Sequence, residues 1–140
     1  MNKYFLLFLL LNAYQNSYAQ IVLDGTMGNT HYHGSTHQLI PHHNKDTLAN
    51  QFTISPEMGT TINHNLFHSF QTFNIKSGET AVFTGDNSLN NVFARVTGGS
   101  VSTINGALNS TINHANFYFI NPAGIVFGKG ASVNVPMLFI

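Results

Sequence analysis

Short apolar runs separated by tight polar turns dominate the chain from residue 20 onward. The runs are rich in β-branched and aromatic side chains and are bounded by Gly, Asn, Asp, Pro or Ser. This alternation is typical of β-strands joined by turns, because branched and aromatic side chains fit a pleated surface. We therefore expect strands, and no helix, at residues 21–23, 52–54, 73–75, 81–83, 92–96, 101–104, 117–120, 125–127, 133–135 and 137–140.

The apolar positions between residues 65 and 75 fit two different periods. Four of them recur with helical spacing: Leu66, Phe67, Phe70 and Phe73. Phe73 also alternates with Ile75, as in a strand. Because Phe favours sheets and the intervening polar residues are weak helix formers, we expect a strand with an irregular start after Asn65.

The later runs return every 8 to 16 residues, a spacing that leaves a sandwich, a barrel and a β-solenoid all open. The tetrapeptide Thr-Ile-Asn-His occurs twice, at residues 61–64 and 111–114, each time shortly before an apolar pair. We interpret the repeat as the same kind of turn-to-strand corner used twice. A chance match within a chain of low complexity is the alternative.

The amino terminus has the pattern of a secretory signal peptide, which we expect at residues 1–19. Lys3 is followed by an apolar stretch at residues 4–11, and small residues, Ser17 and Ala19, occupy the −3 and −1 positions of a cleavage site. The apolar stretch is too short to span a membrane, which takes about 20 residues. The mature chain would begin at Gln20 and would not insert into a membrane after cleavage.

Composition supports a single all-β domain. Only 7% of the 140 residues are charged, the formal net charge is zero, and there is no Cys. An average soluble domain has about 25% charged residues, and a nucleic-acid binder is usually basic, so a nucleic-acid partner is not expected. The 18 Asn, 13 Thr and 12 Gly suit polar turns between strands. Without disulfides, packing and backbone pairing must stabilise the fold.

Residues 29–50 differ from the rest of the chain because they are rich in His and poor in apolar residues, so we expect an exposed loop or hairpin. On a strand, His31 and His33 would project to the same side and could suggest a metal site. However, no Cys is present and no known ligand spacing is matched, so a solvated loop without metal is favoured. The His residues of this segment are His31, His33, His37, His42 and His43.

The sequence offers no arrangement of catalytic residues, and we expect neither an enzyme nor a cofactor. Its carboxylates are scattered singly, at Asp24, Asp46, Glu57, Glu79 and Asp86, with no close pair for acid–base chemistry. His68 and Ser69 are neighbours without an acidic partner or a nucleophile elbow. The single Arg, Arg95, is expected to support a turn or to form a salt bridge.

Three strings, taken in order after Asp24-Gly25-Thr26, resemble a known family. The first covers residues 65–75, the second is Arg-Val-Thr-Gly-Gly at residues 95–99, and the third contains Asn-Pro-Ala-Gly-Ile-Val-Phe-Gly at residues 121–128. Together they look like the amino-terminal secretion domain of two-partner secretion exoproteins of the filamentous haemagglutinin type. The resemblance covers nearly all of residues 21–135, and residues 20–140 would form this domain.

The resemblance implies a right-handed parallel β-helix with a capping sheet at its amino end. It also implies recognition by the periplasmic soluble domains of a partner outer-membrane β-barrel transporter, which exports the exoprotein to the cell surface or medium. In that family the domain is not an enzyme. Because a solenoid can nucleate at one end and propagate, a chain emerging from a pore could fold as it appears.

The resemblance singles out a candidate recognition or folding motif. Its members are Asn121, Pro122 and Gly124 in the turn, together with Asn65, Phe67, Phe70 and Asn116. Pro presets the second position of a β-turn, Asn can bond back to the backbone, and Gly closes the turn. The motif either contacts the transporter or nucleates the fold that the transporter recognises, and we favour the second interpretation because the turn has a sufficient local explanation.

Two features depart from the family pattern. No Asn-Pro-Asn-Leu string occurs, and the chain stops with an apolar stretch at residues 137–140 where more turns of the solenoid would follow. We therefore expect a β-helix truncated at its carboxyl end, an incomplete domain, and no passenger region in this chain. The alternative function is a surface adhesin, in which exposed Asn, Thr and Tyr side chains bind glycans.

Overall fold

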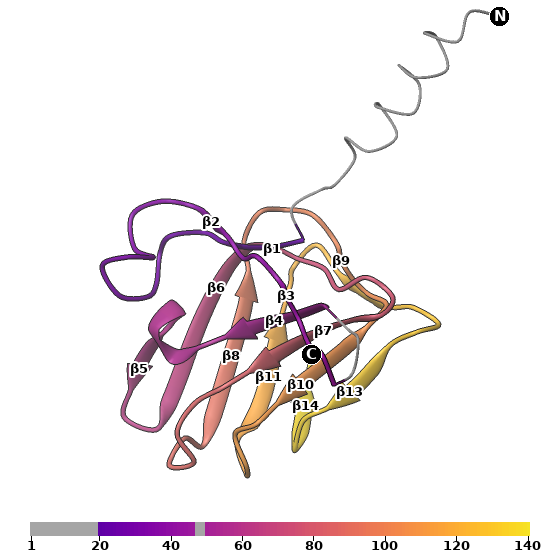
Figure 1. Cartoon of the computed structure of the whole chain (residues 1–140). Helices are drawn as coiled ribbons and strands as arrows, with labels where there is room; N and C mark the ends of the chain where they lie inside the picture. The colour runs from indigo at the N-terminus through magenta and orange to yellow at the C-terminus, as the bar shows by residue number, and fades with distance from the viewer. Residues whose placement is uncertain (1–19, 47–49) are drawn as a thin grey trace, which may run out of the picture.

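Parallel strands stacked into a coil make up most of the molecule (Figure 1). The computed structural model describes residues 20–46 and 50–140, which form a parallel β-helix of about three turns. This architecture excludes the sandwich and the barrel. The predicted signal peptide lies outside the described residues. Within them, no helix is long and apolar enough to cross a membrane.

The largest sheet, sheet A, contains seven strands and runs in the order β14-β11-β8-β6-β1-β2, with β5 also paired to β6. The four solenoid strands β6, β8, β11 and β14 are parallel to one another. Its strands are β1 (Ile21–Leu23), β2 (His37–Gln38), β5 (Thr60–Ile62), β6 (Asn65–Phe73), β8 (Asn91–Val96), β11 (Asn116–Ile120) and β14 (Met137–Phe139).

Two further sheets close the coil. Sheet B has the order β13-β10-β7-β4-β3, and sheet C pairs β12 with β9. Ile75 extends sheet C by a parallel bridge to Ile104. Their strands are β3 (His42–His43), β4 (Asn50–Ile54), β7 (Glu79–Phe83), β10 (Ala107–Ser110) and β13 (Ser132–Asn134) in sheet B, with β9 (Ser102–Ile104) and β12 (Ile125–Phe127) in sheet C.

Each turn of the coil visits sheet A, then sheet C, then sheet B. Positions that stack on adjacent turns are 26 residues apart between Asn65 and Asn91, and 25 apart between Asn91 and Asn116. Inward-facing side chains fill the centre with aromatic rings in edge-to-face and stacked contact. The largest fully buried rings are Phe70, Phe73, Phe83, Phe117 and Phe119.

Antiparallel strands cover the amino end of the coil, as the resemblance implied. β1 and β5 pair with different parts of β6, β2 pairs with β1, and β3 pairs with β4. A one-turn 3₁₀ segment, Pro56–Met58, connects β4 to β5. The free edge of the first parallel strand is thereby paired rather than exposed, which protects it from pairing with another chain.

The ambiguous stretch between residues 65 and 75 is a nine-residue strand, β6, with an irregularity near its end. The register against β1 shifts there, because Val22 pairs with Thr72 whereas Leu23 pairs with Phe70. Gln71 is the extra residue and is exposed. The bulge brings Phe70 and Phe73 to the same side, which explains their helical spacing. We expected the irregularity at the start of the strand, and this prediction is wrong: it lies near the end.

The repeated Thr-Ile-Asn-His tetrapeptide forms two different turns, so the prediction of one corner used twice is wrong. In the first copy Asn63 has a positive φ of 55°, whereas in the second copy it is His114, with a φ of 70°. Ile62 is 56% exposed on the cap hairpin, but Ile112 is fully buried in the coil. Antiparallel pairing surrounds the first copy and parallel stacking the second, so tertiary context decides the conformation.

Four strands escaped prediction: β2, β3, β5 and β10. In β10 only one side chain, Leu108, is fully buried, and its neighbours are small or polar. Pairing on both sides, with β7 and β13, makes this segment a strand. Local apolar pattern is too weak a signal where neighbouring turns supply the hydrogen bonds.

Candidate functional site

The outer face of sheet A displays three rows of stacked side chains. Alternate residues of β6, β8 and β11 point outward, and the parallel register aligns them from turn to turn. One row is polar, one is aromatic, and the third is mixed. The rows are Asn65, Asn91 and Asn116; Phe67, Phe93, Tyr118 and Phe139; and Ser69, Arg95 and Ile120.

The polar row is an amide ladder. Asn91 Nδ2 donates to Asn65 Oδ1 at 2.8 Å, and Asn116 Nδ2 donates to Asn91 Oδ1 at 3.2 Å. The next position, paired with Asn116, is Met137, which is 54% exposed. Two of the predicted motif residues, Asn65 and Asn116, therefore lie in one ladder. The sequence pattern did not single out Asn91, although its spacing of about one turn from both could have revealed it.

The aromatic row contains the predicted residue Phe67. Its ring stacks on Phe93 with centroids 4.8 Å apart, Phe93 stacks on Tyr118 at 4.6 Å, and Tyr118 stacks on Phe139 at 4.7 Å. The interplanar angles are all 12° or less. Because the rings cover each other's faces, this row ties successive turns together and presents ring edges to the surface.

Phe70, also a predicted motif residue, lies on the opposite side of the sheet. It is completely buried and contacts Phe73 and Phe83 edge to face. The predicted motif residues thus lie in three places. Asn65, Phe67 and Asn116 are on the outer face of sheet A, Phe70 is in the core, and Asn121, Pro122 and Gly124 form the corner turn. Phe70 can affect recognition only through the fold, because no partner can touch it without opening the core.

The corner turn, residues 121–124, follows β11 and is bound to the corner of the preceding turn. Asn121 uses its whole side chain: Oδ1 accepts from Ala123 N at 3.0 Å, and Nδ2 donates to Ser100 O and Ser102 Oγ, both at 2.9 Å. Ser102 is buried. Asn121 therefore closes its own turn and joins two turns of the coil.

Gly124 completes this corner. Its N–H donates to Asn121 O, and its carbonyl accepts from Ser102 N, both at 3.0 Å. Its φ of 115° is a conformation that residues with a side chain rarely adopt. The corner turn is thus hydrogen-bonded into the coil. Its role in nucleating the fold and its contact with a transporter stay predictions.

A hydrogen-bond network around Asp24 fastens the cap to the coil. Thr26 and Thr97 donate their hydroxyls to the carboxylate at 2.6 and 2.8 Å, and Ser69 donates a short hydrogen bond to it. Thr26 N adds a bond of 2.9 Å. Burial acts to raise the pKa of Asp24, but these hydrogen bonds outweigh it and lower the pKa below its ordinary value.

Arg95 joins this network through hydroxyls. Its Nε donates to Ser69 Oγ at 2.9 Å, and its Nη2 donates to Thr26 Oγ1 at 3.2 Å. Among the described residues it forms no salt bridge, which was the second of the two roles expected for it. Ser69 and Thr26 stand between Arg95 and Asp24, which places the guanidinium in a fixed position at the surface.

A groove of about 220 Å³ lies between the corner turn and the preceding corner. Its wall includes Arg95 and the exposed Ile120, Pro122 and Ala123. The remaining lining residues are Val96, Thr97, Gly99 and Asn121. We call this the corner groove.

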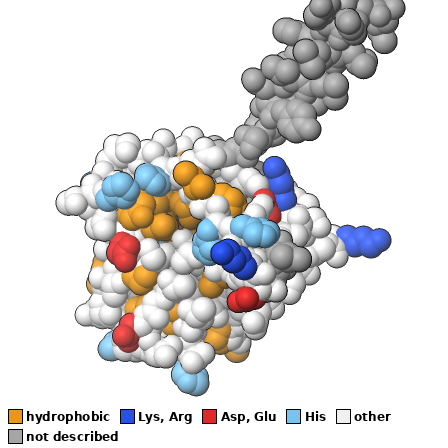
Figure 2. All heavy atoms as spheres, viewed as in Figure 1, with side chains coloured by type: hydrophobic (Ala, Val, Ile, Leu, Met, Phe, Trp, Pro, Cys, Tyr) orange, Lys and Arg blue, Asp and Glu red, His pale blue; other side chains and the backbone are white. Residues whose placement is uncertain are grey.

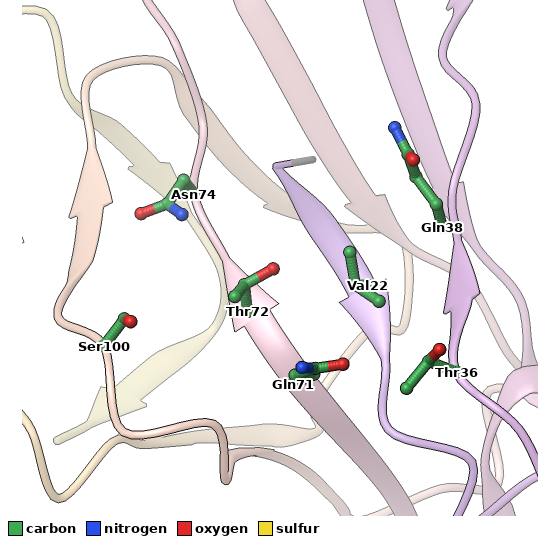
Figure 3. Close-up of a pocket in the computed structure, with 7 residues that line it drawn as sticks. All are labelled: Val22, Thr36, Gln38, Gln71, Thr72, Asn74 and Ser100. Atoms are coloured by element: carbon green, nitrogen blue, oxygen red, sulfur yellow. The ribbon is translucent and has the colours of Figure 1, made fainter. Parts of the chain in front are cut away.

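A second, larger and shallower hollow of about 620 Å³ lies where the cap meets the coil (Figure 3). Val22, Gln38 and Thr72 form a row across three antiparallel strands. The hollow is lined by Val22 and by six residues with amide or hydroxyl side chains, none of them charged: Thr36, Gln38, Gln71, Thr72, Asn74 and Ser100. We call this the neutral groove.

Residues 29–46 of the His-rich segment form turns and two short strands. His31 and His33 lie in a turn, because Tyr32 N and His33 N both donate to Asn29 O, so the strand geometry that suggested a metal site is not present. Within residues 20–46 and 50–140, no three His, Asp or Glu side chains converge as metal ligands. On the face shown in Figure 2, the few acidic and basic side chains form no large patch of one sign.

One His, His68, is buried in the coil instead. Its ring packs edge to face against Phe83. Gly59 of the cap lies against the ring so closely that a side chain at position 59 would collide with it. Neither ring nitrogen has a hydrogen-bond partner among the described residues. Burial lowers the pKa of His68 to about 4, and the Met58 carbonyl, near the ring but outside hydrogen-bond geometry, opposes the shift.

Comparison with known proteins identifies relatives of this fold. A family model described as the TPS secretion domain matches residues 19–140. A heme/hemopexin-binding protein of Haemophilus influenzae is 32% identical over 96 residues, which are 69% of this chain and 10% of that protein. The chain therefore spans about a tenth of the length of this curated relative. No solved structure matches.

Proposed function

Because the chain belongs to the TPS secretion domain family, whose members target exoproteins to two-partner secretion, we propose that a partner outer-membrane β-barrel transporter recognises this domain and exports it. The supporting observation is the family match over residues 19–140 on a β-helix whose amino end is capped. Recognition takes place in the periplasm.

The structure suits a chain that folds as it leaves a pore. Each turn of the coil contacts its neighbouring turns through the sheets, the amide ladder and the aromatic row. A folded turn is therefore a template for the next, and free energy released by each added turn favours outward movement. The cap supplies the first template, since β6 is paired on both of its edges.

Residues 1–19 are proposed as the signal peptide that delivers the chain to the periplasm, after which it reaches the cell surface or medium. The domain acts through its shape and surface and needs neither catalysis nor a cofactor. Any adhesive, cytolytic or ligand-binding activity of an exoprotein would reside in a passenger region. The heme/hemopexin-binding activity in the name of the relative is a property of that much longer protein.

Export of a fused reporter tests this function. A reporter is joined to the carboxyl end of the full 140-residue chain, and the fusion is expressed with and without the partner barrel. We expect the reporter outside the cell only when the barrel is present. Export without the barrel, or retention in its presence, would refute the proposal.

A second candidate function is glycan binding, which the neutral groove favours. Its amides and hydroxyls can donate to and accept from the hydroxyls of an uncharged sugar. No aromatic side chain lines it, so the stacking platform common in sugar sites is missing from the lining residues. Glycan-array binding by the purified chain, reduced by Gln38→Ala and Gln71→Ala, would support this function over export targeting if the reporter test also failed.

A further inference from the structure

The corner groove combines an apolar wall with a positioned positive charge. Ile120 is 46% exposed although it ends a strand of the coil, and Pro122 next to it is exposed as well. Arg95 pairs with Ile120 across β8 and β11 and lines the groove with it, while Ser69 and Thr26 hold its guanidinium toward β6 and the cap. A surface of this kind matches a partner group that is apolar at one end and negative at the other.

The guanidinium still has donors to offer. An Arg side chain has five N–H donors, and the hydrogen bonds described above use Nε toward Ser69 and Nη2 toward Thr26. Both acceptors are neutral hydroxyls, and no carboxylate within the described parts of the chain forms a salt bridge with Arg95. The planar fork is thus held in place with N–H groups free for a carboxylate, which it would bind in two-pronged fashion.

Part of the backbone around the corner groove is already paired. Thr97 N donates to Phe70 O, Gly98 N donates to Gln71 O, and Gly124 N donates to Asn121 O. These N–H groups are not open to a bound strand, so a partner at this part of the groove would be recognised through side chains.

The volume limits what can enter. Pockets for cofactors and drug-sized ligands measure about 300–1,000 Å³. The corner groove, at about 220 Å³, is smaller and has room for one large aliphatic side chain. A peptide segment that inserts one side chain fits better than a small-molecule ligand.

We propose that the corner groove binds an extended segment of the partner transporter's periplasmic domain, taking up one aliphatic side chain while Arg95 binds an adjacent carboxylate. This inference rests on the proposed function and names the partner chemistry of that same surface. It assigns Ile120 and Arg95 to recognition, whereas Asn121 and Gly124 build the corner that holds them in place.

The export assay with the full chain and its reporter distinguishes these roles. Ile120→Asp places a charge on the apolar wall, and Ile62→Asp makes the same change at a similarly exposed Ile on the cap. We expect Ile120→Asp to lower barrel-dependent export by about tenfold or more, because a few anchor side chains at the centre of an interface supply most of its affinity. Ile62→Asp should leave export within about twofold. Urea unfolding of both purified variants controls for stability.

Charge at Arg95 gives an independent readout. We expect Arg95→Glu to reduce export and Arg95→Lys to retain part of it. A peptide probe then separates binding from folding: acetyl-Leu-Glu-Leu-Glu-amide should shift the NMR signals of Gly99 and Ile120 in the purified full chain, and acetyl-Leu-Gln-Leu-Gln-amide should not. The acidic peptide should lose this effect with Arg95→Glu and at high salt.

The outcomes separate this inference from the proposed function. If export depends on the barrel but folded Ile120→Asp and Arg95→Glu variants are exported like the parent, the corner groove is not the recognition surface and export targeting stands. If export does not depend on the barrel, the proposed function fails and the transporter is not the occupant. Equal shifts with both peptides would refute the role of the carboxylate.

Discussion

The corner turn and the His-rich segment are both polar, both at the surface and both rich in residues that can bind ligands, yet they differ in how they are held. Asn121 of the corner turn makes three side-chain hydrogen bonds and joins two turns of the coil. His31 and His33 are exposed, and their side chains make no hydrogen bond to the described residues. Polar composition alone therefore does not show which residues determine stability; their partners do.

His68 should show the largest effect, because it is the one His in the described residues that the coil buries. Its pKa is about 4 in the folded chain and 6.5 in the unfolded chain. The unfolded chain therefore takes up a proton first, and the contribution to stability, complete above about pH 6.5, is lost as the pH falls toward 4. Between pH 7.5 and pH 4.5 we expect a loss of about 2.5 kcal/mol, measured by urea unfolding.

His68→Leu is the matched control for this pH dependence. It replaces the buried imidazole with an apolar side chain that does not titrate. The free energy of unfolding should then stay nearly constant between about pH 4.5 and 7.5. The contribution of Asp24, whose pKa is lowered, is lost only as the pH falls below its ordinary value of 3.8. An unchanged profile in His68→Leu would show that another group titrates.

Asn121→Ala should have the next largest effect. The change removes all three side-chain hydrogen bonds and leaves Ser102 Oγ, which is buried, without this donor. We expect a loss of about 2 kcal/mol in the free energy of unfolding, together with lower export. Stability equal to that of the parent would refute the role of Asn121 in joining the turns.

Gly124→Ala tests the backbone of the same corner. The nearest atom to an added Cβ is Val101 Cγ2 at 3.8 Å, so there is room for it, and the cost comes from the φ of 115°. We expect a loss of about 1 to 2 kcal/mol in urea unfolding. Gly34→Ala, in the His-rich segment at a φ of 97° and with open space around it, is the control for strain outside the coil.

His31→Ala and His33→Ala should have the smallest effect. Each side chain is exposed, and we expect changes within about 0.5 kcal/mol and normal export. Added zinc or copper should leave the melting temperature unchanged. A rise in melting temperature with metal that these substitutions abolish would show that the His-rich segment binds metal and is more than a solvated loop.

The corner turn was predictable because its chemistry is local. Pro after Asn and Gly at the closing position specify a turn regardless of what surrounds it. The strands with a strong apolar pattern, such as β7 and β8, were predicted for the same reason. Residues of the site that depend on stacking were not: Asn91 lies about one turn of the coil from each of its partners, and only the register shows that they meet.

The resemblance anticipated the coil and its cap, and the apolar runs anticipated most strands, because hydrophobic pattern and turn residues act over a few positions. Contacts between residues far apart in the chain decided three features. They decided which segments pair, which of the two identical tetrapeptides buries its Ile, and that Arg95 donates hydrogen bonds to Ser69 and Thr26. Those contacts come from the stacking of whole turns, whose register is a collective property of the sheets. A short sequence window contains the strand but not its neighbours, so only the folded coil shows the outer rows of sheet A and the corner groove.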